Sequence, residues 1–125
     1  QIAYDLQFKG APIFYSWPSN DKTQDYPKDE ADVAWSAPHP ERFLNLLGVQ
    51  SGAARIHIIA HSMGNRAACE ALKGISRNPI PGLEFRHVIL AAPDIDADTF
   101  AELSAALKTI SHRLTLYASS NDKAL

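Results

Sequence analysis

Apolar runs alternate with stretches of helical spacing along the chain. The runs at 11–17, 56–61, 85–92 and 113–118 are short and rich in β-branched or aromatic residues, which predicts four buried strands. Apolar residues three and four positions apart, with proline or glycine near the ends, predict helices at 1–9, 29–37, 40–48, 64–73 and 99–108. Because helices separate the strands, we expect an α/β fold, with a mostly parallel sheet of about four strands and helices on both faces.

Capping chemistry predicts where these helices begin and end. Pro38 and Pro40 are expected to break the chain between two helices, because proline lacks a backbone donor and restrains the residue before it. Gly74 is the expected stop of the helix that begins near 64. Asp98 is the expected N-cap of the last helix.

The stretch 55–72 combines a strand, a sharp turn and a helix. Three isoleucines precede Ala60-His61-Ser62-Met63-Gly64, and an alanine-rich segment follows. Small residues two positions before and after Ser62 let a strand turn directly into a helix, because a bulky side chain there would collide across the turn. This is the pattern of a nucleophile elbow, with Ala60 where glycine is usual. It predicts that Ser62 stands above the sheet and that the Met63 backbone N–H points at the bound group. The alternative is an ordinary strand-to-helix turn whose serine only caps the helix.

Four candidate polar positions follow the ends of the predicted strands. The stretch from Trp17 to Asn20 and the residues Ser62, Asp94 and Asp122 each lie at the end of a predicted strand or in its terminal turn. Ligands of parallel α/β sheets bind beyond the carboxyl ends of the strands, so these positions predict a site at one edge of the sheet. Trp17 is a candidate substrate-binding residue, and an aromatic that covers the sheet edge is the alternative.

A serine nucleophile needs a base, and the base needs a group that orients it. In hydrolases of this architecture the chain order is serine, acid, histidine. Asp122 follows the fourth strand and is the first candidate for the acid, with Asp94 as the alternative. No histidine follows Asp122. His61 adjoins Ser62, but neighbours in a strand point to opposite faces. We therefore expect His61 to hydrogen-bond in the packed interior, with a role as the base as the alternative, and it is also a candidate substrate contact.

Composition narrows the class of protein. The 125 residues are 46% hydrophobic and 21% charged, which fits one globular domain. The net charge of −2 does not indicate the excess of basic residues that is typical of nucleic-acid-binding domains. No apolar run reaches the roughly 20 residues of a membrane span, no signal peptide is recognisable, and no metal or cofactor motif is present, so we expect a soluble protein. The single cysteine, Cys69, is expected to be a small buried apolar residue.

Four blocks of the sequence resemble the α/β-hydrolase superfamily, and within it a little-characterised bacterial group of serine-hydrolase-like proteins. The blocks are FYSWPS (14–19), IHIIAHSMGNR (56–66), LAAPDID (90–96) and LTLYASSNDKAL (114–125). The resemblance implies an esterase or lipase type of serine hydrolase acting on a small-molecule ester. Ser62 would be the nucleophile, Met63 N–H one half of the oxyanion hole, and Asp122 the acid.

The chain departs from the family pattern at both ends. The family's upstream strands, the loop that supplies the second oxyanion donor, and the histidine after the acid are absent from these 125 residues. We therefore expect a single, truncated α/β-hydrolase domain, 1–125, that hydrolyses esters feebly or not at all by itself. The alternative is a non-catalytic scaffold of the same fold, whose open sheet edges would favour partner pairing or self-association.

Overall fold

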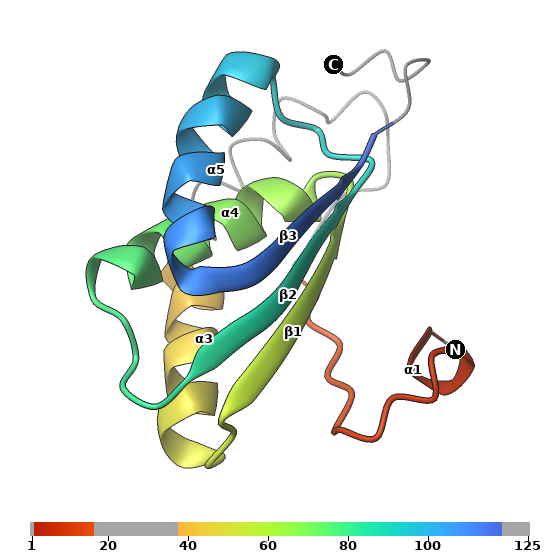
Figure 1. The fold of residues 1–125 in the computed structure, drawn as a ribbon, viewed down its shortest axis with the longest axis vertical. Helices are drawn as coiled ribbons and strands as arrows, with labels where there is room; N and C mark the ends of the chain where they lie inside the picture. The colour runs from red at the N-terminus through yellow and green to blue at the C-terminus, as the bar shows by residue number, and fades with distance from the viewer. Residues whose placement is uncertain (1, 17–37, 119–125) are drawn as a thin grey trace.

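The computed structural model describes residues 2–16 and 38–118, in which helices and parallel strands alternate (Figure 1). The elements are α1 (Ile2–Asp5), α3 (Pro38–Gln50), β1 (Arg55–His61), α4 (Gly64–Arg77), β2 (Glu84–Ala91), α5 (Ala97–Ile110) and β3 (Ser111–Tyr117). The strands form one sheet in the order β1-β2-β3, and both neighbouring pairs are parallel. The predicted α/β class and parallel sheet are therefore confirmed.

The sheet has three strands in the described ranges, where about four were predicted. Residues 11–16, expected to form the first strand, have no regular secondary structure, and Phe14 is 92% exposed there. A strand gains its stability from cross-strand pairing, and the segment 11–16 pairs with none of β1, β2 or β3. Its contact is instead with a helix, since the Tyr15 ring packs 5.2 Å from the ring of Phe43 on α3.

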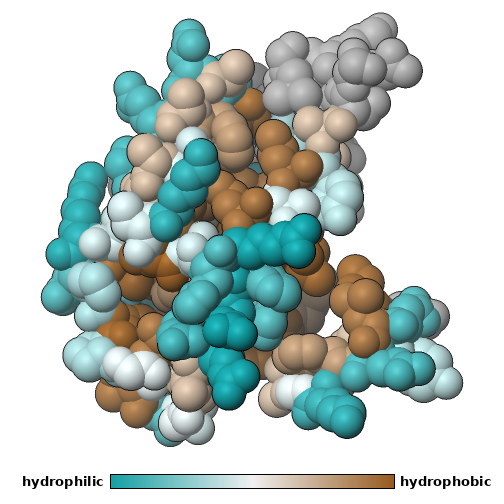
Figure 2. All heavy atoms as spheres, in the orientation of Figure 1, coloured by the Kyte–Doolittle hydropathy of each residue, from teal (hydrophilic) through white to brown (hydrophobic). Residues whose placement is uncertain are grey.

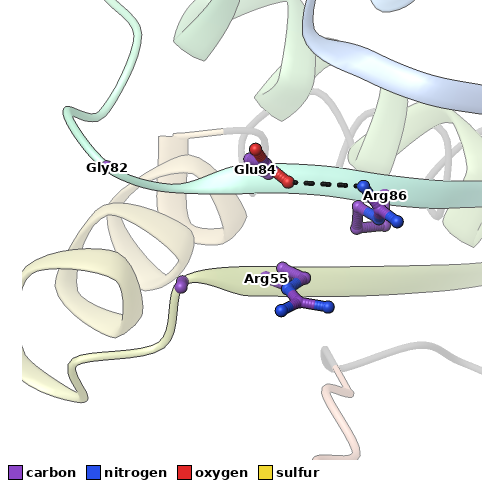
Figure 3. A pocket seen from close by; sticks show the side chains of 5 residues that line it. Arg55, Gly82, Glu84 and Arg86 are labelled. Carbon is purple, nitrogen blue, oxygen red and sulfur yellow. Dashed lines mark ion pairs between the residues drawn. The ribbon is translucent and has the colours of Figure 1, made fainter.

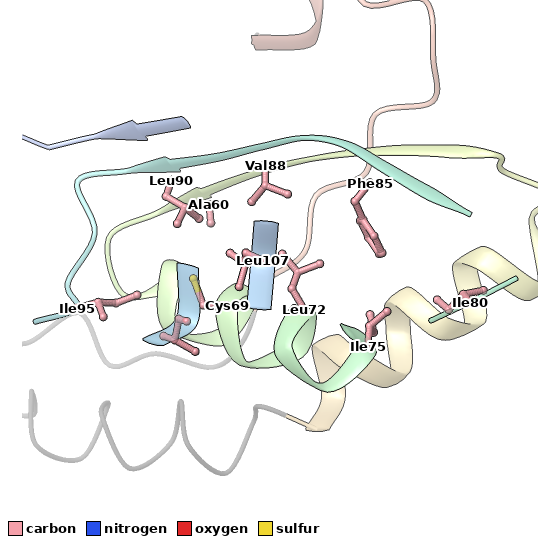
Figure 4. Packing of buried hydrophobic residues seen from close by; sticks show 11 residues of the cluster. Ala60, Cys69, Leu72, Ile75, Ile80, Phe85, Val88, Leu90, Ile95 and Leu107 are labelled. Atoms are coloured by element: carbon pink, nitrogen blue, oxygen red, sulfur yellow. The ribbon is translucent and has the colours of Figure 1, made fainter. Parts of the chain in front are cut away.

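Helices α3, α4 and α5 all cover the same face of the sheet (Figures 1 and 4). On the other face, the described residues place the short α1, and the predicted helix at 29–37 lies outside the described residues. Buried and exposed side chains alternate along the strands, so one face of the sheet is apolar and packs against these three helices. On β1 the side chains that reach the core, Ile56, Ile58 and Ala60, alternate with exposed ones.

The core lies between this face and helices α4 and α5 (Figure 4). Val88 and Leu90 of β2 pack with Leu72 of α4 and Leu107 of α5, and all four are 0% exposed. Cys69 is also 0% exposed, as predicted from the sequence. Each large aliphatic side chain buried in this way stabilises the fold by about 1.5–3 kcal/mol, so this contact fixes α4 against β2, the strand that follows it.

Two predicted helix boundaries are wrong for identifiable reasons. Helix α3 begins at Pro38, two residues before the predicted start, and both prolines fit its first turn, because first-turn N–H groups have no intrahelical partner to lose. The break predicted between this helix and one at 29–37 lies outside the described residues. Helix α4 runs through Gly74 to Arg77. A Cβ at Gly74 would meet only the Glu41 carboxyl group of α3, the mobile end of a flexible side chain, and the glycine does not end the helix.

Helix α5 begins two residues earlier than predicted, and its N-cap is Asp96. The Asp96 carboxylate accepts a 2.9 Å hydrogen bond from the Thr99 backbone N–H. Hydrogen bonds from Thr99 hold the pKa of Asp96 below its ordinary value. Asp98, the predicted cap, lies within the first turn.

If Asp96 is the N-cap of α5, its substitution should destabilise the protein more than substitution of Asp98. Asp96→Ala should lower the melting temperature by a few degrees, because it leaves the Thr99 amide without its acceptor. Asp98→Ala keeps the cap and should have a smaller effect in the same thermal melt. A larger loss from Asp98→Ala would contradict the assignment.

The far face of the sheet carries a pair of histidines in register. His57 of β1 and His87 of β2 are Cα partners, and their rings meet edge to face at 5.0 Å. The Phe8 ring also packs edge to face against His57, with the ring centroids 5.8 Å apart. Desolvation, followed by the influence of His87, lowers the pKa of His57 from its ordinary value of 6.5, and the charges of Arg86 and Arg55 act in the same direction.

This lowered pKa predicts a pH dependence of stability. The folded chain favours neutral His57, so the unfolded chain binds more protons between pH 6.5 and the lowered pKa. The free energy of unfolding should therefore fall as the pH drops through this window. His57→Gln removes the titrating group and should flatten the dependence in urea titrations at several pH values. If the free energy of unfolding changed with pH equally in wild type and in the variant, His57 would not be the source of the pH dependence.

None of the helices in ranges 2–16 and 38–118 is long and apolar enough to cross a membrane.

Candidate active site

Ser62 occupies the turn between β1 and α4 and has a left-handed backbone, with φ of 52°. Left-handed conformations are uncommon for residues other than glycine and store roughly 1–3 kcal/mol of strain when the surrounding structure enforces them. The side chain is exposed. Met63 follows as the N-cap of α4, with φ of −59° and no side-chain cap hydrogen bond in the described residues. The serine hydroxyl and the first amides of α4 therefore lie on the same turn.

Small residues allow this turn, as the sequence predicts. Ala60 is 8% exposed and belongs to the core between sheet and helices. Gly64 is the first residue of α4 and is buried. The chain can therefore reverse from strand to helix within the two residues Ser62 and Met63.

Asn65 clamps the turn to the neighbouring strand. It is 0% exposed, and its side-chain Nδ2 donates to Ser62 O at 2.7 Å and to Ala91 O at 3.0 Å. The backbone N–H of Ser62 also donates to Ala91 O at 3.0 Å. Two donors thus converge on the last carbonyl of β2 and hold the ends of the two strands together.

The turn after β2 repeats the left-handed conformation. Ala92 has φ of 43°, and its N–H donates to Tyr117 O of β3 at 2.8 Å. The next residues lead to Asp94, which is 9% exposed. Arg66 Nε donates to the Asp94 carbonyl, and its guanidinium lies 3.9 Å from the Asp94 carboxylate. Asp94 therefore lies at the same edge as Ser62, and its carboxylate faces the first turn of α4.

The carboxyl ends of the strands bring together part of the predicted site. Ser62, Met63 and Asp94 all lie at this edge. Asp122 and Trp17 fall outside the described residues, so their predicted roles as acid and substrate contact stay predictions. The expectation that His61 lies in the packed interior is wrong, because it is exposed. It points to the face of the sheet that α3, α4 and α5 do not cover.

None of the histidine side chains in the described ranges forms a hydrogen bond with the Ser62 hydroxyl group. His57 and His87 lie together on the far face. His112 lies at the start of β3, 3.6 Å from the Glu84 carboxylate.

A hollow of about 510 Å³ opens at the opposite end of the strands (Figure 3). Arg55 and Arg86 line it beside Glu84, whose carboxylate lies 3.6 Å from the Arg86 guanidinium. Figure 2 shows hydrophilic side chains gathered over this part of the sheet. Since Ser62 lies at the carboxyl ends and this hollow at the amino ends, the hollow is not part of the candidate active site.

Asn65 and Arg66 are the site residues that the sequence analysis missed. Both directly follow the elbow, in the first turn of α4. A short polar residue in a first helical turn usually stays near solvent or acts as a cap. The signal that could have revealed Asn65 is its position three residues after Ser62, where its side chain can reach back to the turn.

Comparisons with known proteins place the chain in a family. The sequence model of the family described as "Alpha/beta hydrolase of unknown function (DUF900)" matches residues 1–125. The chain is also similar to the Uncharacterized protein alr1448 of Nostoc sp. (strain PCC 7120), with 36% identity over 77 residues. That match covers 62% of this chain and 20% of the relative, so the chain spans about a fifth of the relative's length. No solved structure matches the chain significantly. Because the family match extends over all 125 residues, the chain belongs to this family of α/β hydrolases of unknown function.

Proposed function

We propose that this chain carries the nucleophile of a serine hydrolase that cleaves carboxylic esters. The supporting observation is the conformation of Ser62, which is exposed, left-handed and placed at the carboxyl ends of parallel strands. Asp122 is the proposed acid, with Asp94 as the alternative. The histidine base and the second oxyanion donor are proposed to come from residues outside these 125.

The proposed reaction is acyl transfer to water in two steps. Ser62 Oγ attacks the ester carbonyl carbon as its proton passes to the histidine, and the carbonyl oxygen becomes an oxyanion beside the Met63 N–H. Collapse of this intermediate expels the alcohol, which takes the proton from the histidine, and leaves an acyl group on Ser62. Water then attacks the acyl carbon by the same route and releases the acid. Each oxyanion donor contributes roughly 10²–10³ in rate.

Membership of the family favours a hydrolase, and the strain at Ser62 favours a nucleophile over a helix cap. A capping serine has an extended backbone and bonds an amide of the first turn with its oxygen. Here Met63 is the N-cap, so capping does not explain the position of Ser62. His61 and Trp17 are proposed to contact the substrate.

The second candidate is a non-catalytic scaffold. Two observations favour it: no described histidine bonds Ser62, and β1 and β3 are the outer strands of the described sheet. Exposed edge strands can pair with another chain. A scaffold would self-associate or bind a partner without any covalent step at Ser62.

Trapping the acyl intermediate separates the two functions. The natural full-length protein is mixed with 4-nitrophenyl butyrate, quenched in acid within seconds, digested and mapped by mass. The proposal predicts a butyryl group on the peptide that contains Ser62, and none in Ser62→Ala. A folded protein with no butyryl group at any early time would favour the scaffold.

A further inference from the structure

The peptide bond between Ser62 and Met63 is held by two hydrogen bonds to its carbonyl oxygen. Ser62 O accepts two hydrogen bonds from Asn65, from the backbone N–H at 3.0 Å and from side-chain Nδ2 at 2.7 Å. The same Nδ2 donates to Ala91 O at 3.0 Å. This peptide contains the Met63 N–H that the proposed function uses as an oxyanion donor.

The geometry of a peptide bond transmits this restraint. The described chain contains no cis peptide bonds, and in a trans peptide the C=O and N–H point in opposite directions within one plane. Two donors on Ser62 O therefore fix the direction of Met63 N–H. The link to Ala91 O also ties that direction to the end of β2.

We infer that Asn65 is a positioning residue for acyl transfer: its side chain aims the Met63 N–H at the oxygen that becomes negatively charged. The inference rests on the proposed role of Ser62. Asn65 acts through the Ser62–Met63 peptide.

The burial of Asn65 supports a role beyond holding the helix. Its side chain is 0% exposed, and Oδ1 has no hydrogen-bond partner among the described residues. An unpaired buried acceptor is destabilising, and native structures hold few of them. The backbone N–H of Asn65 already bonds Ser62 O, so the helix turn closes without the side chain.

A thiol variant tests the inference on the 125-residue chain without a histidine base. In Ser62→Cys, the ionised thiolate attacks 4-nitrophenyl acetate, forms a thioester and expels 4-nitrophenolate through an oxyanion. The same thiolate displaces iodide from iodoacetamide without forming one. The ratio of these two rates therefore reports stabilisation of the oxyanion and cancels changes in thiol exposure and ionisation.

Cys69 does not interfere with this measurement. It is 0% exposed, and burial, with a smaller effect of Glu70, raises the pKa of its thiol to about 12. Its thiolate is therefore scarce at the pH of the assay, and mass mapping assigns the reaction to position 62.

Adding Asn65→Ala to Ser62→Cys should lower the ratio of acylation to alkylation about tenfold or more. Ile75→Val is the matched control, because it alters a core residue of α4 that is 2% exposed and does not bond the turn. It should leave the ratio unchanged. An unchanged ratio in Asn65→Ala, with the Ser62→Cys ratio above that of a free thiol, would overturn the inference and leave the proposed function standing. A Ser62→Cys ratio no higher than that of a free thiol would instead contradict the proposed oxyanion site.

A spectroscopic measurement covers the case in which Asn65→Ala does not fold. Met63 is the single methionine of the chain, so ¹⁵N-methionine labelling reports its amide alone. Asn65→Asp preserves the shape but replaces the Nδ2 donor by oxygen. The inference predicts a displaced Met63 amide resonance in this variant, and a resonance identical to that of wild type would overturn it.

Discussion

Ser62→Ala should lower ester hydrolysis by the natural full-length protein about 10⁴- to 10⁶-fold in kcat, because alanine removes the only atom that can hold the acyl group. The folded state should change little, since the Ser62 side chain is exposed and the bonds that hold its backbone use main-chain atoms and Asn65. Steady-state kinetics with 4-nitrophenyl butyrate measure the loss.

A second serine provides the control. Ser104 lies on α5, and its hydroxyl bonds the Ala101 carbonyl one turn earlier. Ser104→Ala should keep wild-type kcat and KM. Equal turnover by Ser62→Ala and wild type would show that hydrolysis does not pass through Ser62.

Leu72→Ala should lower the free energy of unfolding by about 2–5 kcal/mol. Leu72 is 0% exposed on α4 and belongs to the cluster that joins α4 to β2 and α5. Truncation removes buried methyl groups and leaves a cavity that fixed strands cannot fill. Urea unfolding followed by circular dichroism gives the free energy.

Leu46→Ala is the matched control, because Leu46 lies on helix α3 and is 44% exposed. The same chemical change there should cost far less. Equal losses from the two substitutions would contradict the placement of the core between the sheet and α4.

The sequence predicted the strands β1, β2 and β3 because each carries a short run of β-branched and aliphatic residues. The prediction failed at 11–16, where the composition favours a strand but the segment contacts α3 through Tyr15 and pairs with none of β1, β2 and β3. Helix ends were also misplaced, because both Asp96 and Asp98 have capping chemistry and only three-dimensional contact selects Asp96. Coverage of one sheet face could not be predicted, since apolar and polar alternation does not say what packs above a strand.

The position of Ser62 was predictable because the turn depends on residues within two positions of it. The part played by Asn65 was not, because its bond to Ala91 joins residues 26 positions apart. The contact between Arg66 and Asp94 was likewise not predictable, because these residues lie 28 positions apart. Local patterns therefore identify the turn at Ser62, and the pairing of β2 with β1 determines which residues support it.

Fluorophosphonate labelling with peptide mapping tests the central claim most directly. The 125-residue chain and the natural full-length protein are treated side by side, with circular dichroism to establish that both are folded. We expect rapid labelling of Ser62 in the full-length protein and slow or absent labelling in the 125-residue chain, because the base is proposed to lie outside it. A folded full-length protein whose Ser62 stays unlabelled would contradict its role as nucleophile, and rapid labelling of the 125-residue chain alone would contradict the proposed origin of the base.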